Sequence, residues 1–137
     1  ALEFCGETIE NMDVSDRMTI TNMAVEAGAK TGIISSDGKT MEFLERYGRK
    51  NDFKAIVPDI DAEYEKVIKI DVNSLSPQIA LPHMVDNVCP VDEAGKIKIN
   101  QVYIGTCTNG RINDFRIAAE LWKGKHCAKG VRVIVAP

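Results

Sequence analysis

Two stretches of the chain carry apolar residues at the spacing of a helix. The first covers about residues 16–28, where Ser15 or Asp16 is expected to cap the first turn and Gly28 suits the left-handed position after the last. The second, residues 38–47, follows an Asp-Gly turn and has one apolar face. Both stretches are predicted to be helices.

Shorter apolar runs have the character of strands. Residues 31–35 contain Gly-Ile-Ile and are predicted as a buried strand, and residues 53–58 as a short strand. Charged and apolar residues alternate from 64 to 72, which is typical of a half-exposed strand. The proline-containing stretch 74–90 is expected to be an extended loop with a short strand near residues 79–81.

The last third of the chain has the clearest pattern. Residues 101–105 and 131–135 are predicted as strands, with a polar turn at 106–110 and a helix at 111–122 between them. A β-α-β unit of this kind has parallel strands and a right-handed crossover. An α/β fold is therefore expected.

A polar stretch at residues 92–100, with Gly95 in its middle, separates this unit from the rest of the chain. Its composition is typical of a linker between lobes. We expect an α/β lobe over residues 1–91, a linker over 92–100 and the start of a second α/β lobe over 101–137.

Composition narrows the classes of protein that the chain can represent. Of its 137 residues, 45% are hydrophobic and 27% charged, with a net charge of −3 and no basic cluster, which argues against a nucleic-acid partner. No apolar run approaches the roughly 20 residues of a membrane-spanning helix, and no secretory signal is present. A cytoplasmic location is expected, with no membrane partner. The chain lacks an initiator Met and stops just after a predicted strand, so we interpret both ends as cuts in a longer chain.

The four cysteines do not form a metal-binding pattern of their own. They stand at positions 5, 89, 107 and 127 with no C-x-x-C pair, and only two histidines accompany them, so a complete zinc site is not expected. Two disulfides are arithmetically possible. Free thiols in a reducing compartment are the expectation, because no secretory feature is present.

Cys107 stands where the predicted strand 101–105 leads into a helix. This is the carboxyl edge of a parallel sheet, where ligands bind, and the N–H groups of a helix start favour a thiolate, a carboxylate or an anionic cluster. Thr108 or Asn109 is expected to cap the helix, and Gly110 to let the backbone approach whatever is bound. Two alternatives stay open. Cys107 could be a small apolar filler, or a nucleophile that has no histidine nearby in sequence to act as its base.

The first predicted helix carries a stripe of polar side chains. At about 100° per residue, Thr19, Asn22 and Glu26 fall in one narrow sector. Apolar residues such as Ile20 and Ala24 face the opposite way. Without further information, such a stripe is the solvated face of an amphipathic helix.

Residues 103–111, Tyr-Ile-Gly-Thr-Cys-Thr-Asn-Gly-Arg, resemble one family closely. The large subunits of isopropylmalate and homoaconitate dehydratases, in the aconitase superfamily, carry Ser-Cys-Thr-Asn-Gly-Arg on this strand and turn, and aconitases share the Ser-Cys-Thr-Asn core. The resemblance continues through Asp114 to the Gly124 turn. Thr106 replaces the usual serine and keeps its hydroxyl.

A second motif covers Arg17 to Ala29. Related dehydratases carry Arg-Met-Thr-Ile-Cys-Asn-Met-Ala-x-Glu-x-Gly-Ala here, and this chain differs mainly by Thr21 in place of the cysteine. Residues 1–6 and 82–88 also resemble segments of the family, so the similarity covers essentially the whole chain. No role is carried over to His83.

The resemblance implies an aconitase-like fold of three α/β/α layers with mostly parallel sheets. It also implies a [4Fe–4S] cluster, with Cys107 as the first of three thiolate ligands. Asn22 would orient the cluster region, and Glu26 would contact the hydroxyl or water at the iron. The family's other two ligands lie in a C-x-x-C beyond residue 137, so the chain alone is expected to bind no cluster and to be inactive.

The implied reaction is the isomerisation of a 2-hydroxy di- or tricarboxylic acid by dehydration and rehydration, with an iron as Lewis acid. The conversion of 2-isopropylmalate to 3-isopropylmalate, in leucine biosynthesis, is the first expectation, with homoaconitate or aconitate hydration behind it. The expected partners are the hydroxy-acid substrate, the rest of the large subunit and a separate small subunit. A non-enzymatic α/β anion-binding module and a purely structural domain are the alternatives.

Overall fold

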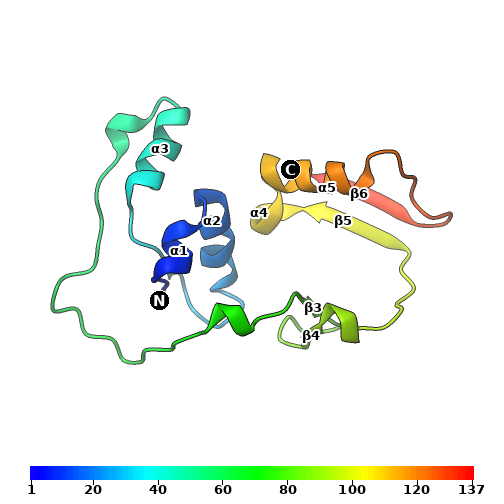
Figure 1. The fold of residues 1–137 in the computed structure, drawn as a ribbon, viewed down its shortest axis with the longest axis horizontal. Helices are drawn as coiled ribbons and strands as arrows, with labels where there is room; N and C mark the ends of the chain where they lie inside the picture. Colours follow the sequence, from blue (N-terminus) through cyan, green and yellow to red (C-terminus); the bar gives the residue numbers. More distant parts are fainter. The chain divides into compact units, whose positions relative to one another are not determined.

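The chain forms two units built from helices and small sheets. In the computed structural model, which describes residues 1–137, the units are Ala1–Ile68 and Lys69–Pro137 (Figure 1). The first unit contains β1 Leu2–Glu3, α1 Glu7–Asn11, α2 Val14–Met23, β2 Gly32–Ile33, α3 Gly38–Arg46 and the 3₁₀-helix η1 Lys50–Asp52. The second contains η2 Val72–Ser74, β3 Gln78–Ala80, β4 Val88–Pro90, η3 Val91–Glu93, β5 Gln101–Gly105, α4 Thr106–Asn109, α5 Ile112–Trp122 and β6 Arg132–Ala136. The lobe boundary expected at residues 92–100 stays a prediction, and no helix or strand forms between η3 and β5.

Helix α2 begins before the predicted start at residue 16. Its N-cap is Asp13, in place of Ser15 or Asp16, and the Asp13 side chain makes no capping bond. Asp16 lies instead in the first turn, where a negative charge interacts favourably with the positive end of the helix dipole.

The α-helical part of α2 ends at Met23, short of the predicted end at residue 28. Beyond it the backbone bonds tighten to three-residue spacing, as in the bond from Glu26 N to Met23 O (3.0 Å). Gly28 has a φ of 81°, and Ala29 N donates to Ala24 O (3.1 Å), which is the Schellman arrangement of a glycine stop. The stop at Gly28 is therefore confirmed, but the turn that leads to it is not α-helical.

The small sheet of the first unit packs directly on α2. β1 and β2 are parallel, with Leu2 opposite Gly32. A Cβ on Gly32 would come within 2.7 Å of the Thr21 Cα and 3.0 Å of the Ala24 Cβ, so only glycine lets the strand lie this close to the helix. Ala24 is buried at this contact, with 2% of its surface exposed. The predicted strand 31–35 is confirmed in position but reduced to two paired residues, and the expected burial is wrong, because Ile33 is exposed in this chain.

Arg17 joins α1, α2 and the start of α3 from inside the first unit. Only 5% of its surface is exposed. Its guanidinium donates to Ile9 O (3.0 Å) and Glu10 O (2.9 Å) at the end of α1. It also donates to Asp37 Oδ2 (2.7 Å), while Asp37 Oδ1 caps α3 by accepting from Thr40 N (3.1 Å). One buried cation therefore fixes three helices.

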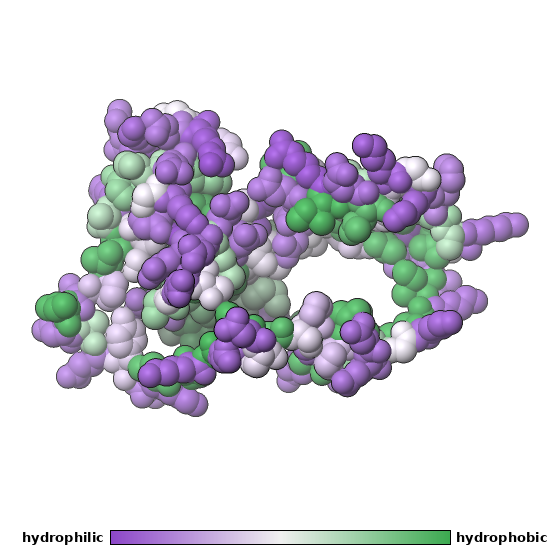
Figure 2. Space-filling model, in the orientation of Figure 1, coloured by the Kyte–Doolittle hydropathy of each residue, from purple (hydrophilic) through white to green (hydrophobic).

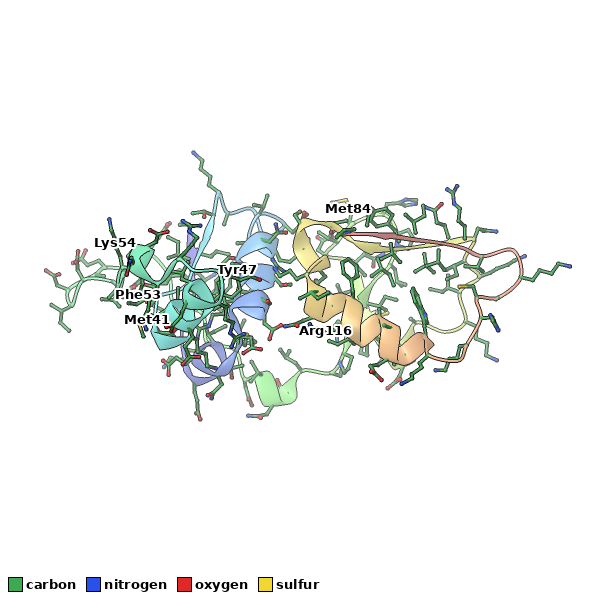
Figure 3. The ribbon with its side chains drawn as sticks, turned by 90° about the horizontal axis from the view of Figure 1, so that it is seen from above. Met41, Tyr47, Phe53, Lys54, Met84 and Arg116 are labelled. Carbon is green, nitrogen blue, oxygen red and sulfur yellow. The ribbon has the colours of Figure 1, made fainter.

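The predicted second helix is confirmed as α3. Its apolar side includes Phe43 and the C-cap residue Tyr47, whose ring centroids are 5.0 Å apart. Figure 3 shows Met41, Tyr47 and Phe53 around this helix. Gly48 follows with a φ of 68°, a conformation that favours glycine.

Two predicted strands of the chain do not form. Residues 53–58 pair with no strand; they are hydrogen-bonded to Ser36, through Ser36 N to Ile56 O (3.0 Å) and Ser36 Oγ to Lys54 O (2.7 Å). Residues 64–71 are in no helix or strand, and their apolar side chains are exposed. The alternating pattern suits a strand, but a strand forms only when a neighbour satisfies its backbone groups, and residues 1–137 supply none here.

The β-α-β unit predicted for the last third is confirmed. β5 and β6 pair in parallel, from Gln101 opposite Arg132 to Gly105 opposite Ala136. β3 and β4 form a separate antiparallel pair, so the short strand expected near residues 79–81 is confirmed as β3. The loop expected for the rest of 74–90 is wrong at residues 88–90, where β4 forms because β3 supplies its backbone partners. Most of the small sheets are parallel, which is consistent with an α/β fold.

The structure leaves much apolar surface open. The chain exposes 11459 Å², whereas a folded monomer of its mass exposes about 7,100 Å². Figure 2 shows hydrophobic residues at the surface. Those on β5, α5 and β6 are Tyr103, Ile112, Ile117, Leu121, Trp122 and Val135. Sheet and helix faces of this kind are normally covered by further elements of the same protein. None of the helices is both long enough and apolar enough to cross a membrane.

Candidate functional site

The loop after β5 places Cys107 at the carboxyl end of a parallel strand pair. β5 ends at Gly105, and α4 follows as a single helical turn before α5 begins at Ile112. The expected polar turn is therefore one turn of helix. Cys107 is exposed and its thiol is free. This edge of a parallel sheet is where α/β proteins bind their ligands.

Two glycines give the loop its sharp path. Gly105 has a φ of 138°, and a Cβ there would overlap the Ala136 carbonyl oxygen of the paired strand. Thr106 follows with a φ of 79°, in the left-handed region that a threonine rarely adopts. A Cβ on Gly110 would come within 2.5 Å of Thr106 O. Gly110 is therefore needed so that the loop can pack against its own backbone. The sequence predicted instead that it would allow a ligand to approach the backbone.

Polar side chains tie this loop to the start of α5. Asn109 Nδ2 donates to Asp114 Oδ1 (3.0 Å), and Arg111 N donates to Asp114 Oδ2 (2.9 Å). The Arg111 guanidinium points back, with Nη1 donating to Thr108 O (2.7 Å) and Nη2 to Cys107 O (3.4 Å). Side chains of the segment 109–114 therefore hold the backbone of residues 107, 108 and 111.

The N-cap of α5 is Arg111, so the cap expected at Thr108 or Asn109 is wrong in position. The helix starts later because α4 occupies the residues that the pattern assigned to a turn. The Asp114 carboxylate, three residues into the helix, accepts a hydrogen bond from the backbone N–H of the N-cap residue Arg111. The hydrogen bond from Asn109, with that from the Arg111 N–H, holds the pKa of Asp114 below its usual value.

Asn22 and Glu26, both in the first unit, differ in burial and in local backbone structure. Asn22 is half-buried in the last turn of α2, whereas Glu26 is exposed in the tightened turn after it. The single sector predicted for Thr19, Asn22 and Glu26 assumed an α-helix through residue 26, and that assumption is wrong. Cys107 belongs to the other unit, so a site that combines it with Asn22 and Glu26 stays a prediction.

The chain supplies one thiol at this sheet edge. Cys5 and Cys127 are exposed elsewhere, Cys89 is half-buried on β4, and all four thiols are free. No group of three or more His, Cys, Asp or Glu side chains lies together so that it could hold a metal ion. Cys107 suits an iron–sulfur cluster in chemistry and in access, because thiolates are the usual ligands of such clusters and an exposed sulfur can meet a group from outside the chain.

Sequence reasoning quoted Arg17, Arg111 and Asp114 within the family motifs but gave no role to any of them, although they organise the two units. The position of Asp114, three residues after the N-cap of a helix, was a readable signal for a capping contact. The other two gave no such signal. Burial of Arg17 and the return of the Arg111 guanidinium onto its own loop depend on the folded path of the backbone.

Comparison with known proteins identifies the family. The model of the aconitase family (aconitate hydratase) matches residues 1–97 and 92–137. The chain is 55% identical over 137 residues to 3-isopropylmalate dehydratase large subunit 2 of Archaeoglobus fulgidus, and 56% identical over 137 residues to the 3-isopropylmalate dehydratase large subunit of Elusimicrobium minutum. Each alignment covers 100% of this chain and 33% of the relative, so the chain spans about a third of the length of the curated relatives it matches. The chain belongs to the aconitase family.

Proposed function

We propose that the chain is part of the large subunit of an iron–sulfur hydro-lyase that converts 2-isopropylmalate to 3-isopropylmalate by dehydration and rehydration. The observation that carries the proposal is Cys107, an exposed thiol at the carboxyl end of β5 in a loop fixed by Gly105 and Gly110. Relatives at 55% and 56% identity, named as 3-isopropylmalate dehydratase large subunits, support this substrate over homoaconitate or aconitate.

Cys107 is proposed as one of three thiolate ligands, with the other two coming from protein outside residues 1–137. When bound, a [4Fe–4S] cluster held in this way supplies a Lewis-acidic iron to the hydroxyl and carboxylate of the substrate. The place of Cys107 at the carboxyl end of β5, where α/β proteins bind their ligands, supports the ligand role over that of an apolar filler.

Asn22 and Glu26 are proposed to face the substrate. Glu26 would move a proton at the departing oxygen of the substrate, for which its exposed carboxylate is suited. Asn22 would orient the reacting region from the end of α2. The Schellman stop at Gly28 supports these roles, because it fixes the backbone that carries Glu26.

The proposal extends to the architecture and partners of the complete protein. We propose a three-layer α/β/α fold, because the faces of β5 and α5 lie uncovered in this chain. A linker at residues 92–100, between lobes at 1–91 and 101–137, is also proposed, and the lack of any helix or strand between η3 and β5 supports it. The rest of the large subunit and a separate small subunit are the proposed protein partners, since the relatives are named as large subunits.

Anaerobic reconstitution of the full-length protein with iron and sulfide tests the proposal. The wild type is expected to take up about four iron and four sulfide per chain and, with its small subunit, to isomerise 2-isopropylmalate faster than homoaconitate or citrate. Cys107→Ser is expected to lose the cluster and at least about 100-fold of the activity, because it removes a ligand of the cluster.

Cys127→Ser is the matched control, since Cys127 is an exposed free thiol of the same unit. This variant is expected to keep both cluster and activity. A stoichiometric, active cluster in Cys107→Ser would refute the assignment of the sulfur.

A further inference from the structure

Arg111 directs its guanidinium onto the loop that carries Cys107. Nη1 donates to Thr108 O at 2.7 Å, and Nη2 reaches Cys107 O at 3.4 Å. The backbone N–H of the same residue donates to the Asp114 carboxylate (2.9 Å). The arginine is therefore anchored at its backbone and at its charged end, and both anchors lie within one short segment.

Asp114 completes this arrangement around Gly110. Its two oxygens accept from Asn109 Nδ2 (3.0 Å) and from Arg111 N (2.9 Å), which are groups on either side of the glycine. A glycine gives the backbone many accessible conformations, and contacts on both sides restrict it to one. Asp114 is half-buried, so water competes less strongly for these bonds than it would at an open surface.

An arginine beside a bound carboxylic acid can have two roles, and they require different contacts. To grip a carboxylate, a guanidinium presents a fork of two N–H groups to the ligand. In this loop Nη1 and Nη2 instead point to the carbonyls of Cys107 and of the next residue. Hydrogen bonds from a charged donor are worth more than neutral ones, so turning the guanidinium toward a substrate would forfeit the short bond to Thr108 O.

We infer that Arg111 is a positioning residue for the Cys107 sulfur, supported by Asp114, and not a substrate-binding arginine. The inference rests on the proposed function, because it requires Cys107 to be a cluster ligand. By holding the carbonyls of residues 107 and 108, Arg111 fixes the backbone from which the sulfur projects. Its loss should therefore weaken retention of the cluster and leave substrate affinity nearly unchanged.

Arg111→Gln in the full-length, cluster-loaded protein tests the inference. The half-time of cluster release to a chelator is expected to shorten at least about tenfold, and the electron paramagnetic resonance spectrum of the reduced cluster to change. KM for 2-isopropylmalate, measured on the loaded fraction, is expected to stay within about twofold of the wild type. Arg111→Lys keeps the charge without the fork and should release the cluster at an intermediate rate. Asp114→Asn should act in the same direction as Arg111→Gln.

Arg116→Gln is the matched control, because Arg116 is an exposed arginine of α5 whose guanidinium donates to Asn113 Oδ1 (3.0 Å), within its own helix (Figure 3). It is expected to leave cluster release, spectrum and KM unchanged.

If Arg111→Gln retains the cluster as the wild type does but its KM rises tenfold or more, the inference is overturned in favour of substrate binding. Cys107→Ser, run in parallel, separates the two claims. If it keeps the cluster, the proposed function fails; if it loses the cluster while Arg111→Gln retains it normally, only the inference about Arg111 fails.

Discussion

At the scale of single residues, the ion pair between Arg17 and Asp37 has the clearest energetic consequence. Asp37 accepts from Arg17 through one oxygen (2.7 Å) and caps α3 through the other. The hydrogen bond from Arg17 is the main cause that lowers the pKa of Asp37 from 3.8 to about 2. Arg17 is buried, so loss of its partner leaves a buried charge uncompensated.

This pair makes the stability of the first unit depend on pH. Because the folded-state pKa of Asp37 lies below its unfolded value, the contribution is complete above about pH 4 and is lost as the pH falls toward 2. Asp37→Asn removes the charge and keeps a good N-cap. This variant is expected to be less stable than the wild type at pH 6, and the difference should narrow by pH 3. Hydrogen exchange of the α2 and α3 amides in the full-length protein measures it.

Asp37→Ala separates the ion pair from the cap. Alanine loses both contacts, so it is expected to cost about 1 kcal/mol more than asparagine at every pH. A difference between the wild type and Asp37→Asn that stays constant from pH 6 to pH 3 would show that the charge of Asp37 is not what stabilises the unit.

At the scale of elements, the junction between β5 and α4 depends on Gly105. A methyl group there would overlap the Ala136 carbonyl oxygen, and the φ of 138° is itself unfavourable for a side chain. Gly105→Ala is therefore expected to push β5 and β6 apart, lower the melting temperature of the full-length protein and reduce its cluster content.

Gly124→Ala provides the comparison for backbone strain alone. Gly124 has a φ of 71°, but a Cβ there would meet nothing within 4 Å. Its substitution is expected to cost about 1–3 kcal/mol and to leave cluster content unchanged. Equal effects of the two alanines would contradict the idea that the strand junction requires the space at Gly105.

The elements with local signals could be predicted from the sequence, and those that depend on a neighbour could not. α3, α5 and the β5–β6 pair follow from apolar periodicity and from the glycines after each helix. Residues 64–72 have an equally clear strand pattern, yet no strand forms, because backbone partners are a property of the surroundings. The early end of α2 reflects a change of hydrogen-bond spacing that side-chain periodicity does not reveal.

The candidate site was predictable to a similar extent. The place of Cys107 at a strand end follows from the order of elements, and the structure bears out that place. The contacts of Arg111 with the loop carbonyls were hidden, because they require α4, a helical turn that was expected to be a simple turn. The family resemblance pointed to the same cysteine and was confirmed by the match over residues 1–97 and 92–137.

At the scale of the whole molecule, the exposed apolar surface agrees with the length comparison. The chain exposes 11459 Å², about 4,400 Å² more than expected for a folded monomer of this mass, and it spans about a third of its relatives. The uncovered faces of β5 and α5 and the unpaired residues 64–71 are where we propose that the rest of the large subunit packs. The site is proposed to be completed by the same parts.

The central claim is that Cys107 binds iron, and anomalous diffraction at the iron absorption edge tests it most directly. Crystals of the full-length, anaerobically reconstituted protein are expected to show an iron peak bonded to Cys107 Sγ, with two cysteines from outside residues 1–137 on the same cluster. An iron cluster bound elsewhere, with Cys107 Sγ packed among apolar side chains, would contradict the account.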